Sequence, residues 1–267
     1  MNLRLSDRTL IMGILNVTPD SFFDGGRYRL TDSAVRRAEE MLEEGADIID
    51  IGGESTRPGS EPISLEEEMD RVIPVFEKLR GFQIPLSIDT YKAKVAEEAC
   101  KLGASVINDI SGLQYDQRIL EVAKEYETHL IIMHIKGTPR NMQDNPYYSD
   151  VVQEVSSFLQ SQAYLAEKSG FPGEKIILDP GIGFGKTLEH NILILRNIEK
   201  FKDLGFPLLV GHSRKSMIGR LLGDRPPEER LFGTLAISAY LILKKVNILR
   251  VHDVKANVEL RKVLEAL

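Results

Sequence analysis

The sequence lacks several features that would place this chain in a membrane, outside the cell or on nucleic acid. It has a single cysteine, Cys100, so no disulfide can form within the chain, and we expect a cytoplasmic protein. No apolar run approaches the ~18 residues that a membrane span needs. Arg4, Asp7 and Arg8 interrupt the apolar N-terminal stretch, which is not the pattern of a signal peptide. The net charge of −6 argues against a general nucleic-acid-binding surface.

Two common kinds of catalytic site are also missing. There is no H-x-x-H pattern and no cluster of cysteines, so a tightly bound zinc ion is not expected. No obvious arrangement for an activated nucleophile of the Ser-His-Asp kind is present either. A Mg²⁺ ion that is bridged by phosphate groups and has few protein ligands remains compatible with the sequence.

Short apolar, β-branched segments alternate with longer amphipathic segments along the chain. The length of 267 residues, with 42% hydrophobic and 28% charged residues, is ordinary for a globular protein of one or two domains. Several of the longer segments have helix signals, such as the capping-box pattern that begins at Ser64 and ends at Glu67. The short segments predict eight strands, at residues 10–14, 48–51, 86–88, 105–108, 130–133, 176–178, 208–210 and 248–251.

The composition of the predicted strands indicates how they pair. They are almost continuously apolar rather than alternating, as is typical of parallel strands that are buried on both faces. Eight such βα units without a break in composition favour a single (β/α)8 TIM-barrel domain over residues 1–267. The alternative is a doubly wound open sheet. That fold usually has a glycine fingerprint after its first strand, which "MGILNVTPD" does not match.

The segment "DPGIGFGK", residues 179–186, is close to two nucleotide-binding patterns and matches neither. A phosphate loop would need glycine where Pro180 stands, and the three alternating glycines do not have the G-x-G-x-x-G spacing. We interpret these glycines as a tight backbone path that leaves room for a flat ring. Lys186 is predicted to be an outer loop residue without a role in phosphate binding.

Polar side chains follow every predicted strand, where the active site of a barrel of this kind is built. Each has a structural explanation on its own, because a single Asp after a strand is more often a cap or turn residue. Eight polar loops at one end are harder to explain in that way, so we expect a small-molecule site there. Asp89, Asn108 and Asp179 suit a flat polar heterocycle, because a carboxylate accepts paired N–H bonds. The groups that could receive phosphate oxygens are Asn16, Arg57, Arg250 and His252.

Eight motifs, each placed after a predicted strand, carry a resemblance over nearly the whole chain. They are "MGILNVTPDSFFDGG", "DIGGESTRPG", "SIDT", "NDISG", "MHIKGTPRNMQ", "DPGIGFGK", "GHSRKS" and "ILRVHDV". In this order they resemble the dihydropteroate synthase family of pterin-binding barrels, the target of sulfonamides. That family joins 4-aminobenzoate to (7,8-dihydropterin-6-yl)methyl diphosphate and releases pyrophosphate. The resemblance therefore implies this folate-pathway activity, a (β/α)8 barrel, a homodimer and the use of Mg²⁺.

The resemblance also implies roles for individual residues. The pterin would be bound by Asp89, Asn108, Met133, Asp179, Lys215 and Arg250. The diphosphate would be bound by Asn16, Arg57, Arg250 and His252, with Asn16 also near Mg²⁺. The 4-aminobenzoate pocket would be formed by Phe22, Thr56, Pro58, Phe184, Lys215 and Ser216. Catalysis would depend on Arg57, Lys215, Arg250 and His252.

Two alternative functions and three departures from the family pattern accompany this interpretation. A related pterin-binding methyltransferase barrel would keep the pterin-facing residues but would not need the diphosphate set. A non-catalytic pterin-binding homologue would have broken loops after the first two strands, yet "NVTPDSF" and "STRPG" are intact. The departures are Phe23, Ile135 and Asn247, which we expect to affect loop dynamics rather than the reaction. The apolar segment "TLAISAYLILKK" is expected either to form a dimer surface or to pack on its own barrel.

Overall fold

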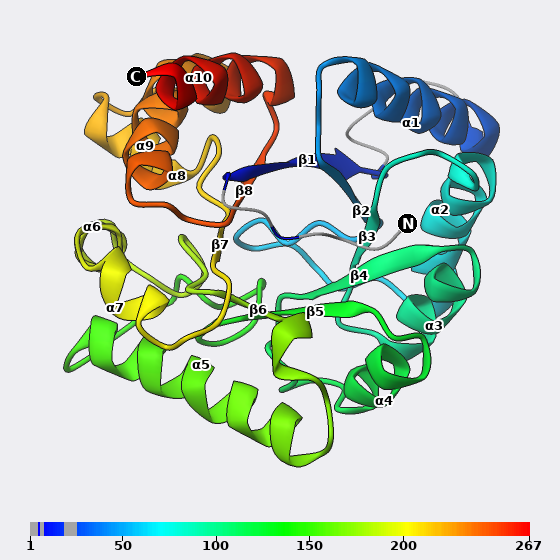
Figure 1. The fold of residues 1–267 in the computed structure, drawn as a ribbon, viewed down its shortest axis with the longest axis horizontal. Coiled ribbons are helices and arrows are strands. Elements are labelled where there is room, and N and C mark those ends of the chain that lie inside the picture. Colours follow the sequence, from blue (N-terminus) through cyan, green and yellow to red (C-terminus); the bar gives the residue numbers. More distant parts are fainter. Residues whose placement is uncertain (1–4, 6–7, 19–25) are drawn as a thin grey trace.

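The structure is a computed structural model that describes residue 5, residues 8–18 and residues 26–267. Phe22 and Phe23 therefore lie outside the described residues. Parallel strands form a ring that the helices surround (Figure 1). The strands are β1 (Leu10–Asn16), β2 (Ile48–Gly52), β3 (Leu86–Asp89), β4 (Ala104–Asp109), β5 (His129–Met133), β6 (Ile176–Asp179), β7 (Leu209–Val210) and β8 (Ile248–Val251).

The helices follow the strands in sequence. They are α1 (Gly26–Glu43), α2 (Leu65–Leu79), α3 (Ala93–Lys101), α4 (Arg118–Glu125), α5 (Val151–Lys168), α6 (Leu188–Arg196), α7 (Ile198–Lys202), α8 (Ser216–Leu221), α9 (Leu231–Leu243) and α10 (Val254–Ala266), with 3-10 turns at Gly173–Lys175 and Pro227–Glu229. The start of α2 is as predicted, since the Ser64 side chain accepts a hydrogen bond from the Glu67 N–H over 3.1 Å. The sequence does not predict α4, α6, α7 or α8. Three of them, α4, α7 and α8, have eight residues or fewer, too few turns for a periodic apolar face to emerge.

The ring closes between β6 and β7, which makes it a barrel. The strands are hydrogen-bonded in the order β6-β5-β4-β3-β2-β1-β8-β7. Leu178 in β6 forms a parallel bridge to Leu208, and its N–H donates to the Pro207 carbonyl over 2.9 Å. The predicted TIM barrel is therefore confirmed, and the open-sheet alternative is wrong.

Apolar side chains fill both faces of the strands, which explains their nearly continuous apolar sequences. One set packs between the strands and the surrounding helices. A smaller set alternates with the first along the strands and fills the inside of the barrel toward the amino-terminal ends of the strands. Its members are Leu10, Met12, Ile48, Val106, Ile131, Ile177, Leu209 and Ile248. The polar residues of the inward-facing positions are thus left at the carboxyl end of the barrel.

Asn247 lies at the opposite end of the barrel from the active-site loops. Its side-chain oxygen accepts from the Leu208 N–H over 2.9 Å, and its carbonyl oxygen accepts from the Leu10 N–H over 2.8 Å. Asn247 thus joins the starts of three strands, and its expected effect on loop dynamics stays a prediction. Among the described helices, none has the length and apolar character needed to cross a membrane.

Candidate active site

The carboxyl halves of β2, β3, β4 and β8 bring a cluster of charged and amide groups together inside the barrel. Arg250 donates from Nε to Asp50 Oδ2 and from Nη2 to Asp89 Oδ2, each over 2.6 Å. Asn108 Nδ2 donates to the same Asp50 oxygen over 3.0 Å. Asp50, Asp89 and Asn108 are buried, and Arg250 is half-buried. Three of the residues predicted to bind the pterin therefore meet around a carboxylate that the sequence did not single out.

Asp50 is the residue missing from the predicted set. It is fully buried, and its Oδ1 has no hydrogen-bond partner within the described part of the chain. In "IIDIG" it is the charged residue in an otherwise apolar strand. A charged side chain is rarely buried without a specific partner. The place of Asp50 within an apolar strand could therefore have marked it as a candidate site residue.

Burial and neighbouring charges determine the pKa values in this cluster. Burial raises the pKa of Asp89 to about 7, although the Arg250 guanidinium acts in the opposite direction. Burial also opposes the charge on Arg250, but Asp50 and Asp89 outweigh it and raise the pKa of the guanidinium. The guanidinium therefore stays charged, and the Asp89 carboxyl is protonated more readily than an exposed one.

A second cluster lies where β6 ends and α8 begins. Asp179 is buried, and its Oδ1 accepts from the Gly181 N–H over 2.7 Å. Lys215 Nζ donates to the Ile182 carbonyl and lies 4.3 Å from the centroid of the Phe184 ring. Burial lowers the pKa of Lys215 to about 7, against the attraction of Asp179. Burial likewise raises the pKa of Asp179, against the attraction of Lys215. The predicted residues Asp179, Phe184 and Lys215 thus lie in one place.

Two of the alternating glycines that follow Asp179, Gly181 and Gly185, are required by close approach to the loop after β5. All three have a positive φ angle: 66° at Gly181, 85° at Gly183 and 63° at Gly185. A Cβ atom on Gly181 would lie 1.9 Å from the carbonyl oxygen of His134, and one on Gly185 would lie 2.3 Å from that of Lys136. The tight backbone path is as predicted, and its immediate cause is contact with the neighbouring loop.

Lys186 is not the outer loop residue that the sequence predicts. Only 2% of it is exposed, and its Nζ donates to the carbonyl oxygens of Gly181 and Phe184 over 2.9 and 3.0 Å. The Nζ atom also lies 2.9 Å from His134 Nδ1. Burial lowers the pKa of Lys186 well below its ordinary value. The prediction was wrong because this loop folds around its own lysine, which satisfies carbonyl groups that would otherwise be buried without partners.

Met133 and Phe184 share a small apolar cluster at the mouth of the barrel. The cluster also contains Ile110, Ile135 and Met142, all of them buried. Ile135, a departure from the family pattern, therefore packs beside two predicted ligand-binding residues. Its expected effect on loop dynamics stays a prediction, and its observed contribution is packing in this cluster.

His252 follows β8 and is held by Ser213. Its Nδ1 lies 3.0 Å from Ser213 Oγ, which also accepts the His252 backbone N–H over 3.2 Å. This arrangement favours a hydroxyl that donates to Nδ1 and an imidazole proton on Nε2. Burial lowers the pKa of His252 to about 4, and the charges of Arg250 and Arg57 act in the same direction. His252 is therefore a neutral hydrogen-bond donor near two of the other residues predicted to bind the diphosphate.

The loop between β2 and α2, residues 53–64, carries three predicted residues and is called loop 2 below. Thr56 is half-buried, and Arg57 and Pro58 are exposed. Within the described residues these three side chains make no hydrogen bond or ion pair with the Asp89–Arg250 or Asp179–Lys215 groups. Among the described residues, Thr56, Arg57 and Pro58 are therefore not bonded to either buried cluster.

Asn16 and Ser216 occupy the remaining two predicted positions. Asn16 ends β1 and is half-buried, and Ser216 is exposed as the first residue of α8. In the described part of the chain, no three His, Cys, Asp or Glu side chains are grouped to hold a metal ion. A lone amide oxygen such as that of Asn16 fits a Mg²⁺ ion that takes its other ligands from phosphate and water.

Comparisons with known proteins agree with this geometry. A family model described as "Pterin binding enzyme" matches residues 12–252. The dihydropteroate synthase of Synechocystis sp. is 49% identical over 97% of this chain and 90% of its own length. The Yersinia pestis dihydropteroate synthase in complex with a sulfonamide drug has a TM-score of 0.92 at 46% identity, covering 99% of this chain and 95% of that one. The Xanthomonas albilineans enzyme with 4-aminobenzoic acid has a TM-score of 0.91 at 42% identity, covering 97% and 93%. The chain therefore belongs to the pterin-binding enzyme family and, within it, to the dihydropteroate synthases.

Proposed function

We propose that the protein condenses (7,8-dihydropterin-6-yl)methyl diphosphate with 4-aminobenzoate to give 7,8-dihydropteroate and pyrophosphate. The observation that carries the proposal is the set of buried donors and acceptors at the carboxyl end of the barrel, in a chain of this family. Asp89, Asn108 and Asp179 would accept and donate along the edge of a pterin ring. Met133 would line the same space, and Arg250 would stack on the ring and reach the diphosphate.

The residues would act through charge and position. Cleavage of the bond between the pterin methylene and oxygen builds positive charge on the pterin and negative charge on the leaving diphosphate. Asp89 and Asp179, both buried, would stabilise the first charge, and Arg57 and Arg250 the second. His252 would add an uncharged N–H donor. The attacking amine is neutral at pH 7 and needs no strong base, so alignment of the two substrates supplies much of the remaining catalysis.

We further propose that Mg²⁺ takes part, held by diphosphate oxygens and by Asn16 at the end of β1. A bound Mg²⁺ would supply additional positive charge to the leaving group. The 4-aminobenzoate would lie between Phe184, Lys215 and Ser216 on one side and Thr56 and Pro58 on the other. Phe22, the remaining residue of this set, lies outside the described residues.

Pyrophosphate release tests the proposed function. Purified protein with Mg²⁺ and the pterin diphosphate is expected to release pyrophosphate rapidly only when 4-aminobenzoate is added, with 7,8-dihydropteroate formed in equal amount. Sulfonamides are expected to compete with 4-aminobenzoate. Absence of dihydropteroate under these conditions would refute the proposal. If methyl transfer from methyltetrahydrofolate to a corrinoid protein were found instead, the methyltransferase alternative would replace it.

We propose that the active form is a homodimer in the cytoplasm and that α9 and α10 form its interface. Large apolar side chains are exposed there: Phe232 is 82% exposed, Leu243 68% and Val263 60%. Such a concentration on neighbouring helices marks an association surface. Sedimentation equilibrium is expected to show a dimer for the unmodified protein and a monomer for Phe232→Glu. Tyr164→Glu, at a 60% exposed position on α5, is the control and is expected to stay dimeric. A monomeric unmodified protein would contradict the proposal.

A further inference from the structure

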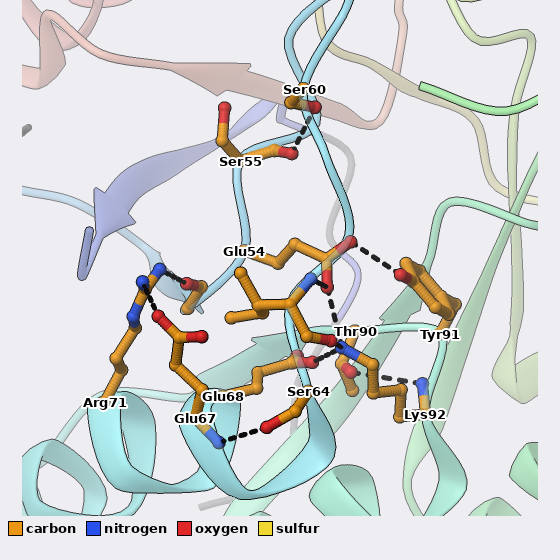
Figure 2. Close-up of polar contacts among 12 residues, drawn as sticks. Glu54, Ser55, Ser60, Ser64, Glu67, Glu68, Arg71, Thr90, Tyr91 and Lys92 are labelled. Carbon is orange, nitrogen blue, oxygen red and sulfur yellow. Dashed lines mark hydrogen bonds and ion pairs between the residues drawn. The ribbon is translucent and has the colours of Figure 1, made fainter. Parts of the chain in front are cut away.

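Both ends of loop 2 meet at one lysine, Lys92, which precedes α3 (Figure 2). Lys92 Nζ lies 2.6 Å from Glu54 Oε2 at the start of the loop and donates to the Ile63 carbonyl over 3.0 Å at its end. The Ile63 N–H donates to the same Glu54 oxygen over 3.3 Å. Lys92 Nζ also lies 2.5 Å from Glu68 Oε2 in α2. Lys92 therefore closes the base of loop 2 and joins it to the helix that follows.

The contacts of Lys92 are shielded from water. The Glu68 side chain is 1% exposed, that of Glu54 6% and that of Lys92 18%. Tyr91 adds a hydrogen bond from its hydroxyl to Glu54 Oε1 over 2.5 Å. Burial acts against the charge on Lys92, but Glu54 and Glu68 outweigh it and raise the pKa of the ammonium. One ammonium thus pairs with two carboxyl groups, and removing it would leave both without this cation.

Residues at the tip of loop 2 bond to one another and to the loop after β5. Ser60 Oγ lies 2.6 and 2.8 Å from the carbonyl oxygens of Ser55 and Arg57, which share its one hydroxyl hydrogen. The Gly59 N–H donates to the Pro139 carbonyl in the loop after β5 over 2.9 Å. Because residues 55–60 are bonded to one another, the position of Arg57 depends on how the base of the loop is held and on the contact with the loop after β5.

The base is held by the same segment that carries a pterin-facing carboxylate. Asp89 ends β3, and Lys92 follows it by three residues. We propose that Lys92 is a positioning residue for the reaction. Its bonds to Glu54 and Ile63 fix the base of loop 2, and therefore the position of Arg57 relative to Asp89. The inference rests on the proposed function, in which Arg57 binds the diphosphate and Asp89 the pterin.

Substitution of Lys92 tests the role, with Lys94 in the first turn of α3 as a matched control. Lys92→Met is expected to lower kcat about tenfold and to raise the KM for 4-aminobenzoate, while pterin affinity changes less than twofold. Lys92→Arg is expected to recover most of the activity. Lys94 is exposed and pairs with Glu97 and Glu98 over 2.9 and 2.8 Å, so Lys94→Met is expected to leave all three quantities unchanged.

A double-mutant cycle separates positioning from general destabilisation. In the Arg57→Ala background, Lys92→Met is expected to lower kcat less than twofold, because the group that Lys92 positions is gone. A full tenfold loss in that background, or a parallel loss of pterin affinity, would overturn the inference. If Lys92→Met does not fold, Glu54→Gln replaces it in the cycle, since that change removes one charge of the same contact without changing the size of the side chain.

Hydrogen exchange of the Gly59 amide gives a measurement that does not depend on activity. Its exchange is expected to accelerate about tenfold in Lys92→Met and to stay unchanged in Lys94→Met. An inactive unmodified protein with this exchange pattern would refute the proposed function and keep the structural part of the inference. Unchanged exchange at Gly59 would overturn the inference even if the unmodified protein is active.

Discussion

Asp179→Asn is expected to weaken pterin binding by about 30- to 1000-fold, or about 2–4 kcal/mol. Asp179 is buried and already accepts the Gly181 N–H with Oδ1. An asparagine can keep that bond, but its NH₂ group would then face the N–H groups of the pterin edge instead of accepting from them. Binding of 4-aminobenzoate is expected to change less than threefold. Calorimetric titration of both ligands checks the result, and equal weakening of both would remove Asp179 from the pterin set.

The same substitution is expected to leave the protein at least as stable as before at pH 7.5. Burial raises the pKa of Asp179, so the folded state binds its proton more tightly than the unfolded state does. This carboxyl therefore favours folding at low pH, and its contribution is lost as pH rises from the ordinary pKa to the raised one. The asparagine variant avoids that loss. As pH is lowered toward 4, the unmodified protein regains the contribution of the protonated carboxyl and the asparagine variant does not. The melting temperature of the variant is therefore expected to fall relative to that of the unmodified protein.

Asp109→Asn is the matched control for a buried carboxylate in this part of the barrel. Asp109 accepts from the backbone N–H groups of Ser111 and Leu113 over 2.8 and 2.7 Å, so its oxygens serve the turn after β4. Its substitution is expected to lower the melting temperature while pterin affinity stays within twofold. Loss of pterin affinity in this variant as well would mean that the effect of Asp179→Asn reflects general disturbance of the site.

Arg57→Ala is expected to lower kcat about 100- to 1000-fold while the fold is kept, because a group that stabilises developing charge contributes about 3–4 kcal/mol. Arg57 is exposed at the tip of loop 2, so its removal leaves no buried partner unpaired. Steady-state kinetics and circular dichroism check the two halves of the expectation. An unchanged kcat would remove Arg57 from the diphosphate set.

Arg140→Ala is the control for the loss of an exposed positive charge near loop 2. Arg140 lies in the loop after β5, its side chain is 70% exposed, and it pairs with Glu61 of loop 2 over 3.3 Å. Because exposed ion pairs contribute little, its kcat is expected to stay within twofold. A large loss here would indicate that net charge at the rim, rather than the placement of Arg57, governs the rate.

The sequence by itself determined the barrel and the end at which its polar side chains gather. Continuous apolar strands require burial on both faces, and a polar residue just after a strand must lie at its carboxyl end. Asp89 and Asp179 could be placed by this rule because each ends its own strand. Both inferences use local patterns, which do not depend on knowing the neighbours in space.

Only the tertiary structure decided which polar groups pair. Arg250 bonds to Asp50 across 200 residues, Lys186 lies against His134 across 52, and Lys92 meets Glu54 across 38. These partners become neighbours when the barrel closes and the loops pack, and no periodic pattern encodes such a choice. The wrong prediction for Lys186 has the same origin. A lysine in a glycine-rich loop is ordinarily solvated, but here its Nζ donates to the carbonyl groups of Gly181 and Phe184 in its own loop and is buried.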